Sequence, residues 1–174
     1  MTRMAQRITG TRTVEAVIGR RVVTDWTDLE GPSAPHVQLS NWANLIVVIP
    51  ATANVLGKVA NGIADDVLTS TILAADCPVV LVPVMNAVMW KKPAIRRNVR
   101  KLREDGYEVV EPRTGTSVTQ GRVEVGSMGD FRAAVSSTLD RLRGLDLSVR
   151  YDESRNCLAT VSDSGPESAS DLSP

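Results

Sequence analysis

The stretch Leu-Ile-Val-Val-Ile-Pro-Ala-Thr-Ala-Asn at residues 45–54 decides the fold. Its first five residues are all apolar and mostly β-branched, so they predict a parallel strand that is covered on both faces. Residues 79–82 (Val-Val-Leu-Val) repeat the pattern and also stop at a proline, Pro83. A third short segment, residues 107–110, ends shortly before Pro112. These three segments predict the strands of one sheet.

Helical patterns lie between and after the predicted strands. Residues 54–61 and 65–75 are rich in Ala and aliphatic residues. Residues 93–105 begin with a proline, which suits a first helical position, and Gly106 follows as a helix-ending residue. Residues 130–143 have apolar residues at helical spacing. This order predicts an α/β fold with a parallel sheet and right-handed crossovers.

The remaining segments give weaker signals. Residues 1–44 suggest only a helix near 13–19 and a short strand at 21–24. A doubly wound sheet normally opens with a strand and a Gly-rich phosphate loop, and neither is recognisable here, so the chain is expected to begin within an α/β unit. Residues 113–128 are rich in Gly, Thr and Ser without a period, which predicts a functional or mobile loop.

The composition changes to Ser, Asp, Glu, Gly and Pro at Asp152. We therefore expect a folded domain at residues 1–149 and a disordered tail at residues 150–174.

The overall composition excludes several classes of protein. The 174 residues contain 20 Lys and Arg against 20 Asp and Glu, which argues against a dedicated nucleic-acid or anionic-membrane surface. No apolar run is long enough to span a membrane. Two cysteines, Cys77 and Cys157, are too few for a disulfide framework or a thiolate zinc site, and His36 is the single histidine. We expect a cytoplasmic protein without a bound metal.

Two of the predicted strands are followed by candidate ligand-binding residues, because ligands of open α/β sheets bind beyond the carboxyl ends of the strands. After the first strand, Thr52 and Asn54 offer short polar side chains at a helix start, which favours an anion. An ordinary strand-to-helix turn with an Asn cap explains the same residues. After the second strand, two methionines and Trp90 flank Asn86, which suits an apolar pocket with one polar group. A core turn filled by methionine is the alternative.

Together with His36, these motifs resemble the homo-oligomeric flavin-containing cysteine decarboxylases. This family includes phosphopantothenoylcysteine decarboxylases and the peptidyl-cysteine decarboxylases of lantibiotic-type pathways. The resemblance extends from His36 to about Pro112. The matching motifs are His-Val-Gln-Leu-Ser-Asn-Trp-Ala (36–43), Pro-Ala-Thr-Ala-Asn (50–54), Lys58, Ala-Asn-Gly-Ile-Ala-Asp-Asp-Val-Leu-Thr (60–69) and Pro-Val-Met-Asn-Ala-Val-Met-Trp (83–90).

The resemblance implies a Rossmann-like (flavodoxin-like) sheet with helices on both faces, FMN as cofactor, and a homotrimer or a multiple of it such as a homododecamer. It makes His36 the base near the substrate thiol and Asn86 the residue that holds the substrate carboxylate. FMN would contact Thr2, Pro50, Thr52, Ala53, Asn54, Asp66, Thr69 and Met85. Substrate would contact Met85, Asn86, Met89, Trp90, Gly121 and Arg122.

The sequence departs from the family pattern at three points. The first strand, the flavin phosphate loop and the first helix have no counterpart, so we expect an N-terminally truncated fold in which Met1–Ala5 matches the end of the family's second strand. Asp66 stands where the family usually has Asn. Residues 113–128 lack the cysteine of the coenzyme A branch, while Gly121-Arg122 resembles the substrate clamp of the peptidyl branch.

The function implied first is the FMN-dependent oxidative decarboxylation of a C-terminal cysteine in a ribosomally made precursor peptide. Oxidation to a thioaldehyde gives the departing CO2 an electron sink, and an enethiol remains. Two alternatives stay open. One is a phosphopantothenoylcysteine decarboxylase of coenzyme A biosynthesis, and the other is a catalytically inactive flavoprotein scaffold.

Overall fold

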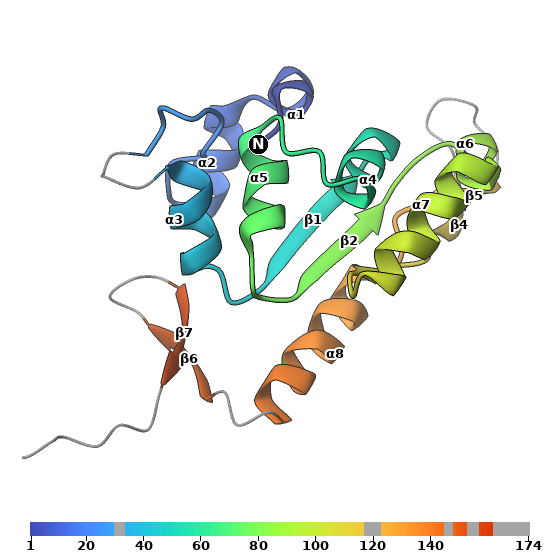
Figure 1. Cartoon of the computed structure of the whole chain (residues 1–174). Helices are drawn as coiled ribbons and strands as arrows, with labels where there is room; N and C mark the ends of the chain where they lie inside the picture. Colours follow the sequence, from blue (N-terminus) through green and yellow to red (C-terminus); the bar gives the residue numbers. More distant parts are fainter. Residues whose placement is uncertain (30–33, 117–122, 145–147, 153–156, 162–174) are drawn as a thin grey trace, which may run out of the picture. The chain divides into compact units, whose positions relative to one another are not determined.

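The computed structural model describes residues 1–29, 34–116, 123–144, 148–152 and 157–161 (Figure 1). The chain divides into two compact units, Met1–Val135 and Ser136–Pro174. The helices are α1 (Arg3–Ile8), α2 (Thr11–Ile18), α3 (Pro35–Trp42), α4 (Ala53–Ala60), α5 (Val67–Ala74), α6 (Ala87–Lys91), α7 (Pro93–Glu104) and α8 (Phe131–Gly144). The strands are β1 (Ile46–Ala51), β2 (Val79–Pro83), β3 (Glu108–Val109), β4 (Arg113–Thr116), β5 (Val123–Ser127), β6 (Ser148–Asp152) and β7 (Cys157–Val161).

The three predicted strands form one parallel sheet in the order β1-β2-β3. Val47 lies opposite Val80, and Val80 lies opposite Glu108. All five residues of the central strand, β2, are buried, as its unbroken apolar run predicts. The prediction of an α/β fold with a parallel sheet is therefore confirmed.

Successive side chains of the central strand enter two different apolar clusters, because neighbouring residues of a strand point to opposite faces. Val79 and Leu81 join the larger cluster, which also contains Leu56 of α4 and Leu102 of α7. Val80 and Val82 pack in a second cluster with Val110. Apolar side chains thus cover both faces of the sheet.

Local signals set the starts of the helices that surround the sheet. The Thr52 hydroxyl accepts a hydrogen bond of 3.3 Å from the Val55 backbone N–H and caps α4. Asp66 and Thr69 form a reciprocal capping box at the start of α5. Pro93 opens α7 at the position predicted from the sequence.

The structure corrects the predictions for the first residues of the chain. Met1–Ala5 was expected at the end of a strand, but Thr2 instead caps α1 by accepting a 3.2 Å hydrogen bond from the Ala5 N–H. Residues 21–24 form no strand either, because Thr24 is held in a turn by the carboxylate of Asp28. The helix predicted near residues 13–19 is present as α2.

Two hairpins were not predicted. Within residues 113–128, β4 and β5 pair antiparallel, whereas the composition predicted only an irregular loop. In the second unit, β6 and β7 also pair antiparallel, and these strands, apart from Ser148 and Val149, fall within the residues expected to form a disordered tail. Residues 153–156 and 162–174 lie outside the described part of the chain, and the boundary at residue 149 stays a prediction.

The described residues contain neither a membrane-spanning helix nor a cluster of metal-binding side chains. None of their helices is long and apolar enough to cross a membrane. No group of three or more His, Cys, Asp or Glu side chains in this part of the chain is placed to hold a metal ion.

Candidate functional site

The ends of the first two strands meet at one edge of the sheet. The Val84 N–H, just after β2, donates a 3.2 Å hydrogen bond to the carbonyl of Ala51, the last residue of β1. The turn containing Thr52 and Asn54 therefore lies beside the turn containing Asn86. This arrangement is the one expected for neighbouring parallel strands.

Asn86 caps the short helix α6. Its side-chain Oδ1 accepts a 2.7 Å hydrogen bond from the backbone N–H of Val88. Because the group that accepts an N–H hydrogen bond must be the amide oxygen, the Nδ2 group is the end of the side chain that remains for a ligand. Nδ2 only donates hydrogen bonds, which suits a carboxylate.

The hairpin formed by β4 and β5 is seated on the turn that carries Asn86. The Met85 N–H donates a 3.2 Å hydrogen bond to the Gly126 carbonyl. Gly126 has a φ of +146°, and a Cβ at this position would lie 2.1 Å from the Met85 carbonyl oxygen. Only glycine allows this approach without a shift of the backbone. Gly121 and Arg122, predicted to contact substrate, lie outside the described residues.

The other predicted substrate-contacting residues differ in exposure. Met89 is 45% exposed, whereas Trp90 is 5% exposed and belongs to the larger core cluster. The guanidinium of Arg96 lies 5.1 Å from the centre of the Trp90 ring. Met85 is partly buried against the same cluster. The structure thus gives Trp90 a place in the core.

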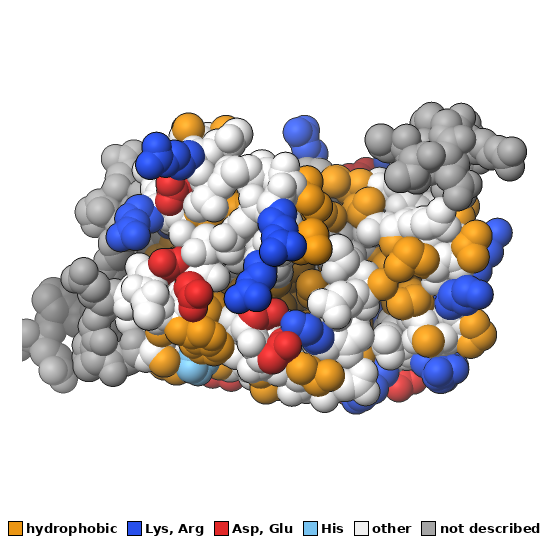
Figure 2. All heavy atoms as spheres, turned by 90° about the horizontal axis from the view of Figure 1, so that it is seen from above, with side chains coloured by type: hydrophobic (Ala, Val, Ile, Leu, Met, Phe, Trp, Pro, Cys, Tyr) orange, Lys and Arg blue, Asp and Glu red, His pale blue; other side chains and the backbone are white. Residues whose placement is uncertain are grey.

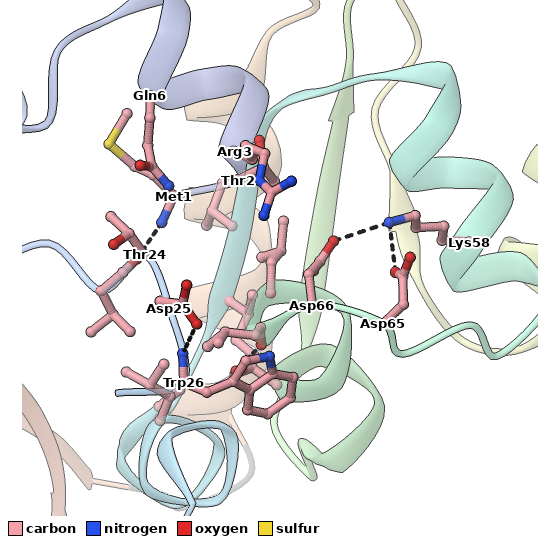
Figure 3. A pocket seen from close by; sticks show the side chains of 18 of the residues that line it. Met1, Thr2, Arg3, Gln6, Thr24, Asp25, Trp26, Lys58, Asp65 and Asp66 are labelled. Atoms are coloured by element: carbon pink, nitrogen blue, oxygen red, sulfur yellow. Dashed lines mark hydrogen bonds and ion pairs between the residues drawn. The ribbon is translucent and has the colours of Figure 1, made fainter. Parts of the chain in front are cut away.

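A pocket of about 760 Å³ lies beside β1, the edge strand of the described sheet. Figure 2, a view of the molecule from above, shows basic and acidic side chains close together in the middle of the visible face, with hydrophobic side chains beside them. The lining residues of the pocket come from the first 26 residues, from α3, β1, α4 and α5, and from the connections that precede β1 and α5 (Figure 3). They include Thr2, Arg3, Asp25, Trp26, Trp42, Val47, Lys58, Asp65, Asp66 and Leu68.

One ion-pair cluster forms part of the pocket wall. Lys58 Nζ lies 2.6 Å from an oxygen of Asp65 and 3.1 Å from an oxygen of Asp66. Burial raises the pKa of Asp66, but hydrogen bonds from the Thr69 N–H and Lys58 outweigh it and leave this pKa below its usual value. The carboxylate that replaces the usual Asn is therefore ionised, paired and used as a helix cap.

His36 lies in the first turn of α3, and its ring contacts Trp26. The two ring centres are 5.4 Å apart with the planes at 79°. His36 Nδ1 is buried and has no hydrogen-bond partner among the described residues. Trp26 lines the pocket beside β1, whereas Asn86 follows β2. Asn86 is not among the residues that line the pocket to which Trp26 belongs.

Three residues of the site had no predicted role. Trp26 contacts His36, Gly126 supports the Asn86 turn, and Lys58 neutralises Asp66. Of the three, only Lys58 belonged to a recognised motif. The scarcity of aromatic residues, 3% of the chain, is the one sequence signal that could have drawn attention to Trp26.

Comparison with known proteins identifies the family. The family model described as Flavoprotein matches residues 1–143. The chain therefore belongs to the Flavoprotein family. A crystal structure of the FMN-dependent cysteine decarboxylase SpaF is similar, with a TM-score of 0.75 and 53% identity. That match covers 82% of this chain and 77% of SpaF.

Two curated relatives represent different branches. The coenzyme A biosynthesis bifunctional protein CoaBC of Bacillus subtilis (strain 168) is 46% identical over 129 residues, which are 71% of this chain and 32% of that protein. The chain thus spans about a third of the length of this relative. Mersacidin decarboxylase of Bacillus sp. (strain HIL-Y85/54728) is 37% identical over 113 residues, 61% of this chain and 58% of that protein. SpaF and mersacidin decarboxylase are decarboxylases by name, which supports an enzyme of this class.

Proposed function

We propose that the protein is an FMN-dependent decarboxylase that acts oxidatively on the C-terminal cysteine of a ribosomally made precursor peptide and releases an enethiol. The position of Cys77, one of the two cysteines of the chain, supports this choice. Cys77 precedes β2, while Asn86 follows it. A strand rises about 3.3 Å per residue, so the length of β2 separates Cys77 from Asn86.

A saturated product would require a proton donor such as a thiol within reach of the enethiol beside Asn86, while the reduced cofactor would supply the electrons. Cys77 precedes β2 and lies at the opposite end of this strand, away from a substrate held beside Asn86. Residues 113–128 contain no cysteine. The distance of Cys77 from Asn86 and the lack of a cysteine in residues 113–128 therefore favour release of the unsaturated enethiol over a saturated product.

The residues around the strand ends fit FMN. In α4, the Thr52 carbonyl and hydroxyl accept the Leu56 and Val55 N–H groups. The Ala53 and Asn54 N–H groups open the helix, where a phosphate is favoured. The small side chains of this turn leave room for a flat ring. Thr2 and Asp66 in the pocket, Thr69, and Pro50 and Met85 at the strand ends are the other residues we assign to the cofactor.

In this mechanism, bound FMN supplies the two-electron oxidation of the substrate. His36 accepts the proton of the cysteine thiol, because an imidazole exchanges protons readily near neutral pH. Asn86 Nδ2 donates to the substrate carboxylate and orients it. A neutral amide avoids strong binding of a charge that disappears as CO2 leaves, so it does not stabilise the ground state above the transition state.

We further propose that the site is completed in a homotrimer or a multiple of it. No residue of α1 or α2 is buried within the described chain. Ile8 is 79% exposed and Val17 is 81% exposed, which leaves apolar surface for a second copy to cover. Light scattering of the purified protein should give the mass of three chains or a multiple of three, and a monomer at micromolar concentration would contradict this assembly.

The second candidate is a phosphopantothenoylcysteine decarboxylase, favoured by the 46% identity to CoaBC. Both substrates, each labelled in its cysteine carboxyl carbon, can be given separately to the FMN-loaded protein, with His36→Asn as the inactive control. We expect labelled CO2 from the peptide alone. Release from phosphopantothenoylcysteine alone would establish the second candidate. Release from neither substrate would favour the inactive scaffold.

A further inference from the structure

We propose that Trp26 is a positioning residue for His36. The two rings meet edge to face, and the buried Nδ1 of His36 has no hydrogen-bond partner among the described residues. We assign the imidazole proton to this nitrogen and the indole as its neighbour, so that Nε2 is the nitrogen that takes the substrate proton. The role of His36 as a base rests on the proposed function. The contact between the two rings does not.

The ring contact has the geometry of a specific aromatic interaction. Edge-to-face pairs are favoured at centre distances of about 4.5–7 Å. Trp26 and His36, at 5.4 Å and 79°, are such a pair. In Figure 3 the Trp26 indole extends into the pocket below Asp66. The indole thus links the pocket wall to the first turn of α3.

Local hydrogen bonds fix the turn that presents the indole. One carboxylate oxygen of Asp28 accepts from the Thr24 N–H and the Thr24 hydroxyl, both at 2.6 Å, and from the Asp25 N–H at 2.9 Å. The Trp26 N–H donates a 2.6 Å hydrogen bond to Asp25 Oδ1. A turn held by four hydrogen bonds can hold a ring that is itself 41% exposed.

An aromatic neighbour such as Trp26 suits the buried Nδ1 of His36. Nδ1 has no hydrogen-bond partner among the described residues. A neutral imidazole that acts as a base through Nε2 must carry its proton on Nδ1. The face of an aromatic ring is a weak acceptor for such an N–H group. Trp26 thereby stabilises the tautomer in which the accessible nitrogen has a free lone pair.

The test uses the fact that His36 is the only histidine of the chain. The ¹⁵N chemical shifts of the two ring nitrogens report the tautomer of neutral His36 without overlap from another residue. In the wild type we expect the proton on Nδ1. Trp26→Leu should shift the population toward the Nε2–H tautomer and lower kcat roughly tenfold with little change in KM. Trp26→Phe, which keeps an aromatic face, should restore both values.

Trp42→Leu is the matched control. Trp42 also lines the pocket and is 49% exposed, but the Arg20 guanidinium lies over its ring at 5.3 Å. This variant should keep the wild-type tautomer. An unchanged tautomer in Trp26→Leu, or the same change in Trp42→Leu, would overturn the proposal. The NMR result needs no turnover, so it separates this proposal from a failure of the decarboxylase assignment.

Discussion

The side-chain oxygen of Asn86 accepts a 2.7 Å hydrogen bond from the backbone N–H of Val88. Because of this bond, the two ends of the Asn86 amide have different roles. The oxygen caps α6, and the nitrogen is left as a neutral donor at the end of β2. An aspartate could cap the helix equally well, but it would offer a negative charge to a substrate carboxylate.

The first prediction separates these two purposes. Asn86→Asp keeps the cap, so the unfolding free energy should change little. Decarboxylation should fall by about 10²-fold or more, because the orienting donor is lost and a like charge is added. Asn86→Ala should lose similar activity and also about 1 kcal/mol of stability with the cap. Thermal unfolding and single-turnover CO2 release measure the two effects, and an active Asn86→Asp variant would contradict the assigned donor role.

The second prediction concerns the support of the Asn86 turn. Gly126→Ala places a Cβ 2.1 Å from the Met85 carbonyl oxygen and 3.3 Å from the Ala87 nitrogen, at a φ of +146°. We expect a loss of about 1–3 kcal/mol of stability and a displaced turn with reduced activity. Gly57→Ala is the control, since its Cβ would meet Asn98 at an ordinary 3.6 Å. Equal effects of the two substitutions would argue against a special role for Gly126.

The third prediction concerns the charge cluster in the pocket wall. Lys58→Met leaves the ionised Asp66 without its 3.1 Å partner. If the FMN phosphate binds nearby, its affinity should fall roughly fivefold, which corresponds to about 1 kcal/mol. Adding Asp66→Asn removes the carboxylate charge but keeps a capping side chain, so the double variant should regain the affinity. Flavin fluorescence titration measures this, and a double variant as weak as the single one would refute the electrostatic explanation.

The fourth prediction is a pH dependence of the turn that holds Trp26. Hydrogen bonds from the Thr24 side chain, the Thr24 N–H and the Asp25 N–H lower the pKa of Asp28 from 3.8 to about 2. A lowered folded-state pKa means that the ionised carboxylate stabilises the fold above about pH 4. This contribution is lost as the pH falls through about 2.

Denaturant unfolding of the wild type and Asp28→Asn between pH 5 and pH 2 isolates this effect from the other carboxylates. The difference in stability between the two proteins should shrink as the pH falls. A constant difference would show that Asp28 does not titrate with folding.

The elements that the sequence predicted best are those set by local patterns. The apolar runs that form β1 and β2 and the proline that opens α7 each act within a few residues. The helix after β1 was also predicted, but with an Asn cap, whereas Thr52 caps it. The meeting of the two strand-end turns also followed, because neighbouring parallel strands end at one edge. The resemblance to known decarboxylases then pointed to the correct family.

The remaining features depend on contacts that no local pattern encodes. The strand expected at Met1–Ala5 needs a pairing neighbour, and without one the cap at Thr2 favours a helix. The pairing of β4 with β5 brings together residues rich in Gly and Thr, which show no clear alternation in isolation. The contact of Trp26 with His36 joins an irregular turn to a helix across ten positions of sequence.

The mass of the product tests the central claim most directly. A peptide ending in cysteine should be incubated with the FMN-loaded protein and examined by mass spectrometry. Oxidative decarboxylation removes CO2 and two hydrogens, so the account predicts a loss of about 46 Da together with reduction of one FMN per peptide. A loss of about 44 Da would instead show that the product had been reduced again. That result, or an unreacted peptide alongside turnover of phosphopantothenoylcysteine, would contradict the assignment.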